Sequence, residues 1–313
     1  MYLFIINPKS GNGRSLRTWK RVREALDLKK IAYASLFTDS AEEVDAMVTE
    51  TLDQHGSWNA IVVIGGDGSI HSLLPVLKRT GIPLGVIPAG SGNDTARGFG
   101  IPRDPLAALK LILTGSARAA DLISVAGVPV MTAVAAGFDA QVSENVNGSR
   151  YKKICNAVGA GRLAYVIGVL HTLVTFKPGP VSVTCGGQTV SYPSAWLTAV
   201  SNVPSYGGGL VINPQAKTDD GMLDVCVVHD CSRLQLLLLF PTVLKGTHVK
   251  LPIVTLLRGD TVGIRFDRPR LAQGDGEDVS ALPMDFRADP GAIRVFSALK
   301  PSIDVHPKKP DRI

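Results

Sequence analysis

The sequence predicts an N-terminal α/β domain with a doubly wound, mainly parallel sheet, followed by a β-rich, antiparallel, sandwich-like second domain. The chain has 313 residues, more than one average domain, and its 45% hydrophobic content is enough for two cores. Up to about residue 124, apolar runs alternate with segments of helical spacing, as in α/β folds. Beyond about residue 125, β-rich segments are broken by glycine and proline.

The first domain is predicted to be a βαβα alternation. Its continuously apolar strands indicate burial on both faces beneath covering helices. We place this domain at residues 1–124, with residues 298–313 returning to it. The expected strands are Leu3–Ile6, Ala34–Phe37, Ile61–Ile64 and Leu84–Ile87, and the expected helices are Leu16–Leu28, Glu42–Leu52 and Ser72–Leu77.

The second domain is predicted over residues 125–297. Helices are expected to interrupt it around Cys155–Val174 and Arg233–Leu244. The expected strands are Val128–Ala135, Val181–Cys185, Ala195–Ser201, Met222–Val228 and Thr261–Phe266.

The leucine-rich run Leu234–Phe240 has two interpretations. A buried helix end, stopped by Pro241, is favoured because short apolar runs usually belong to a core. The alternative is a surface that meets lipid. The run is far shorter than the roughly 20 residues of a membrane span.

The charge balance permits an anionic partner without specifying one. The 33 basic and 27 acidic residues give a net charge of +6, spread along the chain. This balance suits an anionic membrane face or an acidic ligand, and we expect no nucleic-acid partner. The N-terminus enters a strand-like segment without the features of a signal peptide, so we expect a cytoplasmic protein.

Three glycine-rich loops follow apolar runs of the first domain, at Asn7–Gly13, Gly65–His71 and Pro88–Asp94. Glycine lets the backbone approach an anion closely, so that N–H groups point at phosphate oxygens. In a doubly wound sheet, the carboxyl ends of the strands line the ligand crevice. One such loop alone is ordinary turn composition. Three together predict a nucleotide phosphate site.

These loops resemble the diacylglycerol kinase catalytic family, which includes sphingosine and ceramide kinases and bacterial soluble lipid kinases. The resemblance continues in the second domain. Asn213–Asp224 looks like the Asp-Gly-x-Leu segment of the family, and Gly274–Glu277, followed by Pro290–Ala292, looks like its Asp-Gly-Glu element.

The resemblance implies ATP and Mg²⁺ as cofactors. Asp67 and Asp94 would belong to an acidic, water-linked Mg²⁺ network near the transferred phosphate, with Asp67 also counted as catalytic. His71 departs from the asparagine that similar kinases often carry, which puts the local geometry in question. The implied nucleotide-binding residues are Asn7, Pro8, Lys9, Ser10, Gly11, Thr38, Gly65, Gly66, Asp67, Gly68, Ser69, Ile70, His71, Ser91, Asn93 and Asp94.

By the same resemblance, either Asp275 or Glu277 is the base that accepts the proton of the attacking hydroxyl. Without the resemblance, an exposed hairpin turn is the simpler interpretation of this segment. A structural Mg²⁺ site is implied at Asp220 with the carbonyls of Lys217 and Met222, and a metal-free turn is its alternative.

The sequence therefore predicts an ATP-dependent lipid kinase that works in phospholipid biosynthesis and contacts the membrane peripherally. Diacylglycerol is the leading acceptor, with phosphatidic acid as product. The alternatives are a sphingoid or polyprenol acceptor, a soluble acceptor such as NAD, or a nucleotide sensor without catalysis. A homodimer fits the resemblance, but no residue specifies it.

Overall fold

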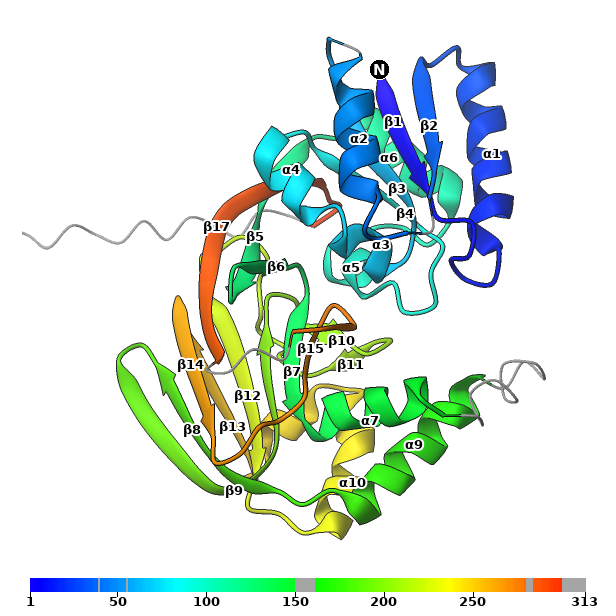
Figure 1. The fold of residues 1–313 in the computed structure, drawn as a ribbon. Helices are drawn as coiled ribbons and strands as arrows, with labels where there is room; N and C mark the ends of the chain where they lie inside the picture. Colours follow the sequence, from blue (N-terminus) through cyan, green and yellow to red (C-terminus); the bar gives the residue numbers. More distant parts are fainter. Residues whose placement is uncertain (39, 55, 150–160, 280–283, 300–313) are drawn as a thin grey trace, which may run out of the picture.

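The computed structural model describes residues 1–38, 40–54, 56–149, 161–279 and 284–299, which form two domains (Figure 1). The first contains a parallel sheet in the order β2-β1-β3-β4. Every residue of β3 and β4 is buried, because successive side chains point to opposite faces and both faces are covered. The strands are β1 (Tyr2–Ile6), β2 (Tyr33–Phe37), β3 (Ala60–Gly65) and β4 (Leu84–Pro88).

Helices cover this sheet through apolar stripes. In α1, the buried residues Trp19, Val22 and Leu26 recur every three or four positions and so share one face. α1 packs with α6, and α2 packs with α4. The helices are α1 (Arg14–Leu28), α2 (Val44–Asp53), α3 (Asp67–His71), α4 (Leu74–Thr80), α5 (Asp94–Gly98) and α6 (Pro105–Thr114).

The second domain is built from antiparallel strands around a core of its own, which confirms the predicted fold class. A further core lies between β9, β12 and the helices α7, α9 and α10. The strands are β6 (Val128–Val130), β7 (Ala133–Gly137), β8 (Gly179–Cys185), β9 (Gln188–Ser201), β10 (Ser205–Tyr206), β11 (Leu210–Val211), β12 (Leu223–His229), β13 (Val254–Gly259), β14 (Thr261–Phe266), β15 (Ala272–Gly274) and β16 (Glu277–Asp278). The helices are α7 (Phe138–Asn147), α9 (Gly161–Thr175), α10 (Arg233–Val243) and the 3-10 turn η1 (Thr247–Lys250).

Two long strands, β5 (Ala117–Val125) and β17 (Met284–Phe296), pair antiparallel and connect the domains (Figure 1). The first half of β17 pairs with β14 of the second domain, and its end pairs with β4 of the first. The proposed boundary after residue 124 lies at the end of β5. Of the segment expected to return, Leu299 accepts a hydrogen bond from Arg118 (2.6 Å), whereas 300–313 lie outside the described residues.

The favoured interpretation of Leu234–Phe240 as buried is wrong for four of its seven residues, which are exposed. Helix α10 buries Leu236 and Leu239 but exposes Leu234 and Leu238. The helix also continues past Pro241 to Val243, because a proline this close to the end removes little of the hydrogen-bond ladder. Within the described ranges, no helix combines the length and the apolar character that a membrane crossing requires.

Candidate active site

The three glycine loops meet at the carboxyl ends of β1, β3 and β4. A Cβ on Gly90 would lie 2.4 Å from the Cα of Gly66, so side chains there would hold the second and third loops apart. A Cβ on Gly11 would lie 2.1 Å from the carbonyl oxygen of Ala89, and Gly11 also has a left-handed φ of 58°. Close backbone approach at both points requires glycine.

A cavity of about 450 Å³ opens between these loops. Its size is within the range typical of small-molecule sites. Of the predicted residues, it is lined by Asn7, Ser10, Gly11, Thr38, Gly66, Asp67, Gly68, Ser69, Ser91, Asp275 and Glu277. We call it the nucleotide cavity.

Other predicted nucleotide contacts lie outside that lining. Lys9 is exposed and donates its backbone N–H to Asn7 (3.0 Å), and Ile70 is buried in the core. Asn93 binds Gly90 at both backbone atoms (2.9 and 2.8 Å) and so closes the third loop. The remaining members of this group are Pro8, Gly65, His71 and Asp94.

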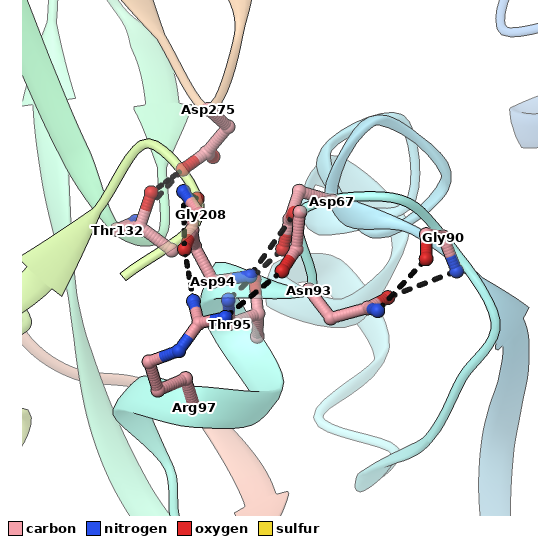
Figure 2. A network of polar contacts seen from close by, with 10 residues as sticks. Asp67, Gly90, Asn93, Asp94, Thr95, Arg97, Thr132, Gly208 and Asp275 are labelled. Carbon is pink, nitrogen blue, oxygen red and sulfur yellow. Dashed lines mark hydrogen bonds and ion pairs between the residues drawn. The ribbon is translucent and has the colours of Figure 1, made fainter. Parts of the chain in front are cut away.

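Asp67 joins the second loop to the third. Its carboxylate accepts hydrogen bonds from the backbone N–H groups of Asp94 (3.1 Å) and Thr95 (2.9 Å), the first residues of α5 (Figure 2). Each oxygen accepts one of these bonds, which leaves acceptor capacity on both. Asp67 therefore fixes the loop geometry and can still bind a cation.

Asp94 has partners in both domains. It forms an ion pair with Arg97 and accepts hydrogen bonds from the backbone N–H of Gly208 (3.0 and 3.1 Å), which belongs to the second domain (Figure 2). Burial raises the pKa of Asp94, although Gly208 and Arg97 oppose the shift. This carboxylate connects the domains, and its part in a Mg²⁺ network stays a prediction.

Asp275 is held even more firmly. Its side chain is only 2% exposed and accepts hydrogen bonds from the N–H of Met131 (2.8 Å) and from the N–H and hydroxyl of Thr132 (2.8 and 2.5 Å). His71 contributes a fourth contact, with Nδ1 3.0 Å from the carboxylate. Burial would lower the pKa of His71, but Asp275 and the charge of Glu277 raise it overall.

Glu277 contrasts with Asp275. The residue is exposed and lines the nucleotide cavity, and its Oε1 would lie 3.1 Å from a Cβ on Gly68. The left-handed turn at Asp275 and Gly276 (φ of 53° and 90°) brings both carboxylates to the cleft. The sequence alone left the choice of base open between them. In the structure, Asp275 has four hydrogen-bond contacts, whereas Glu277 is exposed.

A second cavity adjoins the first and lies between the domains. Asp67 and Asp275 line both cavities, while the second-domain side of the new cavity includes Asp139 and Ser143 of α7. We call it the acceptor cavity. A group bound in one cavity can thus reach a group bound in the other at the shared carboxylates.

Sequence inspection missed several residues that hold this site together. Thr132, Arg97 and Gly208 were not singled out, because their roles depend on contacts between distant segments. Arg97 lies three residues after Asp94 on α5, and that spacing is a usable signal for an ion pair.

Asp220, one of the residues expected to bind a structural Mg²⁺, has a cationic partner in the structure. Asp220 forms an ion pair with the guanidinium of Arg258, whose Nε is also 3.7 Å from Asp224. The other Asp220 oxygen accepts the N–H of Met222 (3.2 Å). In the described part of the chain, no group of three or more histidine, cysteine, aspartate or glutamate side chains is arranged for a metal. Asp220 is therefore paired with Arg258 in this structure, and the Mg²⁺ site at Lys217, Asp220 and Met222 stays a prediction.

Fold and site together define a two-domain phosphotransferase, and the comparisons with known proteins agree. The diacylglycerol kinase catalytic domain model matches residues 1–125, and the YegS C-terminal NAD kinase beta sandwich-like domain model matches residues 132–297. A diacylglycerol kinase of Mycobacterium tuberculosis (strain ATCC 25618 / H37Rv) is 33% identical over 298 residues, which cover 93% of each chain. One of Staphylococcus aureus (strain MRSA252) is 27% identical, covering 90% of this chain and 87% of the other.

A crystal structure of a diacylglycerol kinase from Bacillus anthracis str. Sterne shares the fold, with a TM-score of 0.70 and 20% identity over 95% of this chain and 96% of the other. The chain belongs to the diacylglycerol kinase catalytic family, which confirms the resemblance seen in its motifs. It is a lipid kinase, and the family implies ATP as the phosphoryl donor.

Proposed function

We propose that this protein transfers the γ-phosphoryl group of ATP to the hydroxyl of diacylglycerol, forming phosphatidic acid, with Mg²⁺ as cofactor. The observation that carries the proposal is that Asp67 and Asp275 line both the nucleotide cavity and the acceptor cavity. Phosphoryl transfer needs the donor phosphate and the acceptor hydroxyl in line with each other, with the negative charge of the transferred group compensated. The two cavities meet at such a point.

Glu277 is the proposed general base. It is exposed to the nucleotide cavity and can accept a proton, whereas the oxygens of Asp275 already accept four contacts. In the proposed step, Glu277 takes the proton of the lipid hydroxyl while the oxygen of that hydroxyl bonds to the γ-phosphorus. The bond from that phosphorus to the bridging oxygen breaks, and ADP leaves with the electron pair.

Asp275 is a positioning residue in this scheme. Its bonds to Met131, Thr132 and His71 fix the turn that carries Glu277, and the His71 contact joins that turn to the second glycine loop. Asp67 is the residue that would hold Mg²⁺, since its oxygens keep acceptor capacity beside both cavities. When bound, the ion supplies positive charge to the phosphates.

The acceptor is tested with γ-labelled ATP, Mg²⁺ and mixed micelles that each contain one alcohol: diacylglycerol, a sphingoid base, a polyprenol, or no lipid with NAD in solution. We expect label in diacylglycerol. Label in another alcohol would overturn the acceptor, and ATP binding without any transfer would overturn the reaction.

A further inference from the structure

We propose that the exposed apolar sides of α9 and α10 form a docking face for an anionic lipid bilayer. The proposal rests on the proposed function only in that a lipid acceptor must be reached at a membrane. Both helices lie at the end of the second domain that is remote from the first domain (Figure 1).

α10 is apolar on opposite sides. Leu236, Leu239 and Val243 are buried against the domain, whereas Leu234 and Leu238 are each 64% exposed. At 3.6 residues per turn, the exposed pair lies on the side opposite the buried three. An ordinary surface helix carries polar residues there, so a leucine stripe facing solvent indicates another environment.

α9 presents a similar stripe next to it. Val166, Leu170 and Val174 recur every four residues and are all exposed, with Val174 at 71%. Arg233, the first residue of α10, donates hydrogen bonds to the α9 carbonyls of Leu173 (2.9 Å) and Val174 (3.4 Å). This junction joins the start of α10 to the end of α9, and we call the two exposed stripes together the apolar face.

The charge around the apolar face selects the partner. The chain has no aspartate or glutamate at residues 145–218 or 231–259, the stretches that contain α9 and α10. Lys177 follows α9 and Lys245 follows Leu244 at the end of α10, and both lysines are exposed. The exposed acidic residues Glu144 of α7 and Asp230 lie just outside these stretches. Exposed lysines beside apolar helical side chains are typical of proteins that lie on anionic membranes.

A second copy of the chain fits this face less well. A two-fold symmetric interface places each patch against itself, so Lys177 and Lys245 would meet lysines of the partner with no acidic residue from the same stretches to pair with them. Lipid phosphates complement the same charges.

The apolar face also adjoins the acceptor cavity through α7. Asn145 of α7 donates a hydrogen bond to Thr172 of α9 (2.9 Å), and the rings of Phe138 and Phe176 pack edge to face. Other residues of α7, among them Asp139 and Ser143, line the acceptor cavity. A bilayer on this face would therefore lie one helix away from the site that receives its lipid.

The test compares Leu234→Gln/Leu238→Gln with Leu28→Gln, a control that removes a leucine 85% exposed on α1 of the first domain. Glutamine retains helix propensity, so folding should be preserved. Sedimentation with vesicles of phosphatidylcholine and phosphatidylglycerol, without ATP, should show at least about tenfold weaker binding for the double variant only. Wild-type protein should bind pure phosphatidylcholine weakly.

Activity separates docking from chemistry. The double variant should lose activity on long-chain diacylglycerol in vesicles and keep wild-type turnover on a short-chain diacylglycerol dissolved as monomers. Equal vesicle binding by all three proteins would overturn the docking face. So would a wild-type protein that does not bind vesicles but is a dimer, if the double variant is a monomer. Selective loss of vesicle binding in a protein that phosphorylates no lipid would support the docking face and overturn only the proposed function.

Discussion

Two groups of carboxylates lie in this molecule, and their negative charges are compensated in different ways. The cleft cluster sits between the glycine loops and the second domain, and the distal cluster sits near β12 and the connecting strands. The cleft cluster consists of Asp67, Asp94, Asp275 and Glu277, and the distal cluster consists of Asp121, Asp220 and Asp224.

In the distal cluster, each carboxylate has a partner within the protein. Asp121 accepts the N–H groups of Gly221 (2.6 Å) and Gly291 (2.8 Å), and Arg258 lies against both Asp220 and Asp224. The cleft cluster differs at Glu277, which is exposed to a cavity. Carboxylates with partners inside the protein connect segments of the chain, whereas an exposed one at a cavity is available for chemistry.

The largest effect is expected at Asp275, where activity and stability should fall together. Asp275→Ala removes the acceptor for two buried N–H groups, a hydroxyl and a histidine, which should lower the free energy of unfolding by about 3 kcal/mol or more. Urea unfolding and the kinase assay measure the two losses. Thr132→Val, which removes one of these hydrogen bonds, should lower the free energy of unfolding by less. If Asp275→Ala is as stable as the wild type, these hydrogen bonds do not stabilise the fold.

Glu277 should affect activity alone. Glu277→Gln keeps the size of an exposed side chain but removes the base, so turnover should fall at least about 100-fold while the melting temperature stays unchanged. Asp285→Asn, an exposed carboxylate on β17 outside both cavity linings, is the matched control and should retain activity. Near-normal turnover in Glu277→Gln would move the role of base to another residue.

The distal cluster should make stability depend on pH through Asp224. Burial raises the pKa of Asp224 to about 6, against the opposing effect of Arg258. A raised pKa means that the stabilising contribution is complete below the unfolded value of 3.8 and is lost as pH rises through about 6. Between pH 4 and pH 7, Asp224 should therefore reduce the free energy of unfolding by about 2–3 kcal/mol.

This dependence is measured as the difference between wild type and Asp224→Asn in urea unfolding across that range. The difference should change between about pH 4 and pH 6 and level off above that, because the asparagine does not titrate. Parallel stability curves for the two proteins would show that Asp224 ionises normally.

The smallest effect concerns Mg²⁺ in the distal cluster. With Arg258 paired to Asp220, the melting temperature of the nucleotide-free wild type should not change between millimolar Mg²⁺ and EDTA. Arg258→Met frees the carboxylate, so Mg²⁺ should then raise the melting temperature by a few degrees. If EDTA destabilises the wild type instead, the metal site at Lys217, Asp220 and Met222 is occupied and Arg258 gives way to it.

The sequence predicted the parallel sheet closely, because strands such as Ile61–Ile64 and Leu84–Ile87 are continuous apolar runs with glycine loops at their ends. It did not predict β5 and β17. Both strands carry mixed polar and apolar residues, and they pair with each other although they lie far apart in the sequence. For α10, the sequence favoured a buried run and kept an exposed surface only as the alternative. Composition shows that a run is apolar, but only the packed neighbours decide which of its residues are covered.

The sequence by itself determined the fold class, the family and the positions of the glycine loops, because these depend on local periodicity and on glycine conformations that neighbouring residues set. Only the tertiary structure decided which carboxylates have hydrogen-bond partners and which stay exposed. Asp275 and Glu277 are two residues apart and equally acidic in the sequence. They differ because Met131, Thr132 and His71 converge on the first from other segments, whereas the second stays exposed beside the nucleotide cavity.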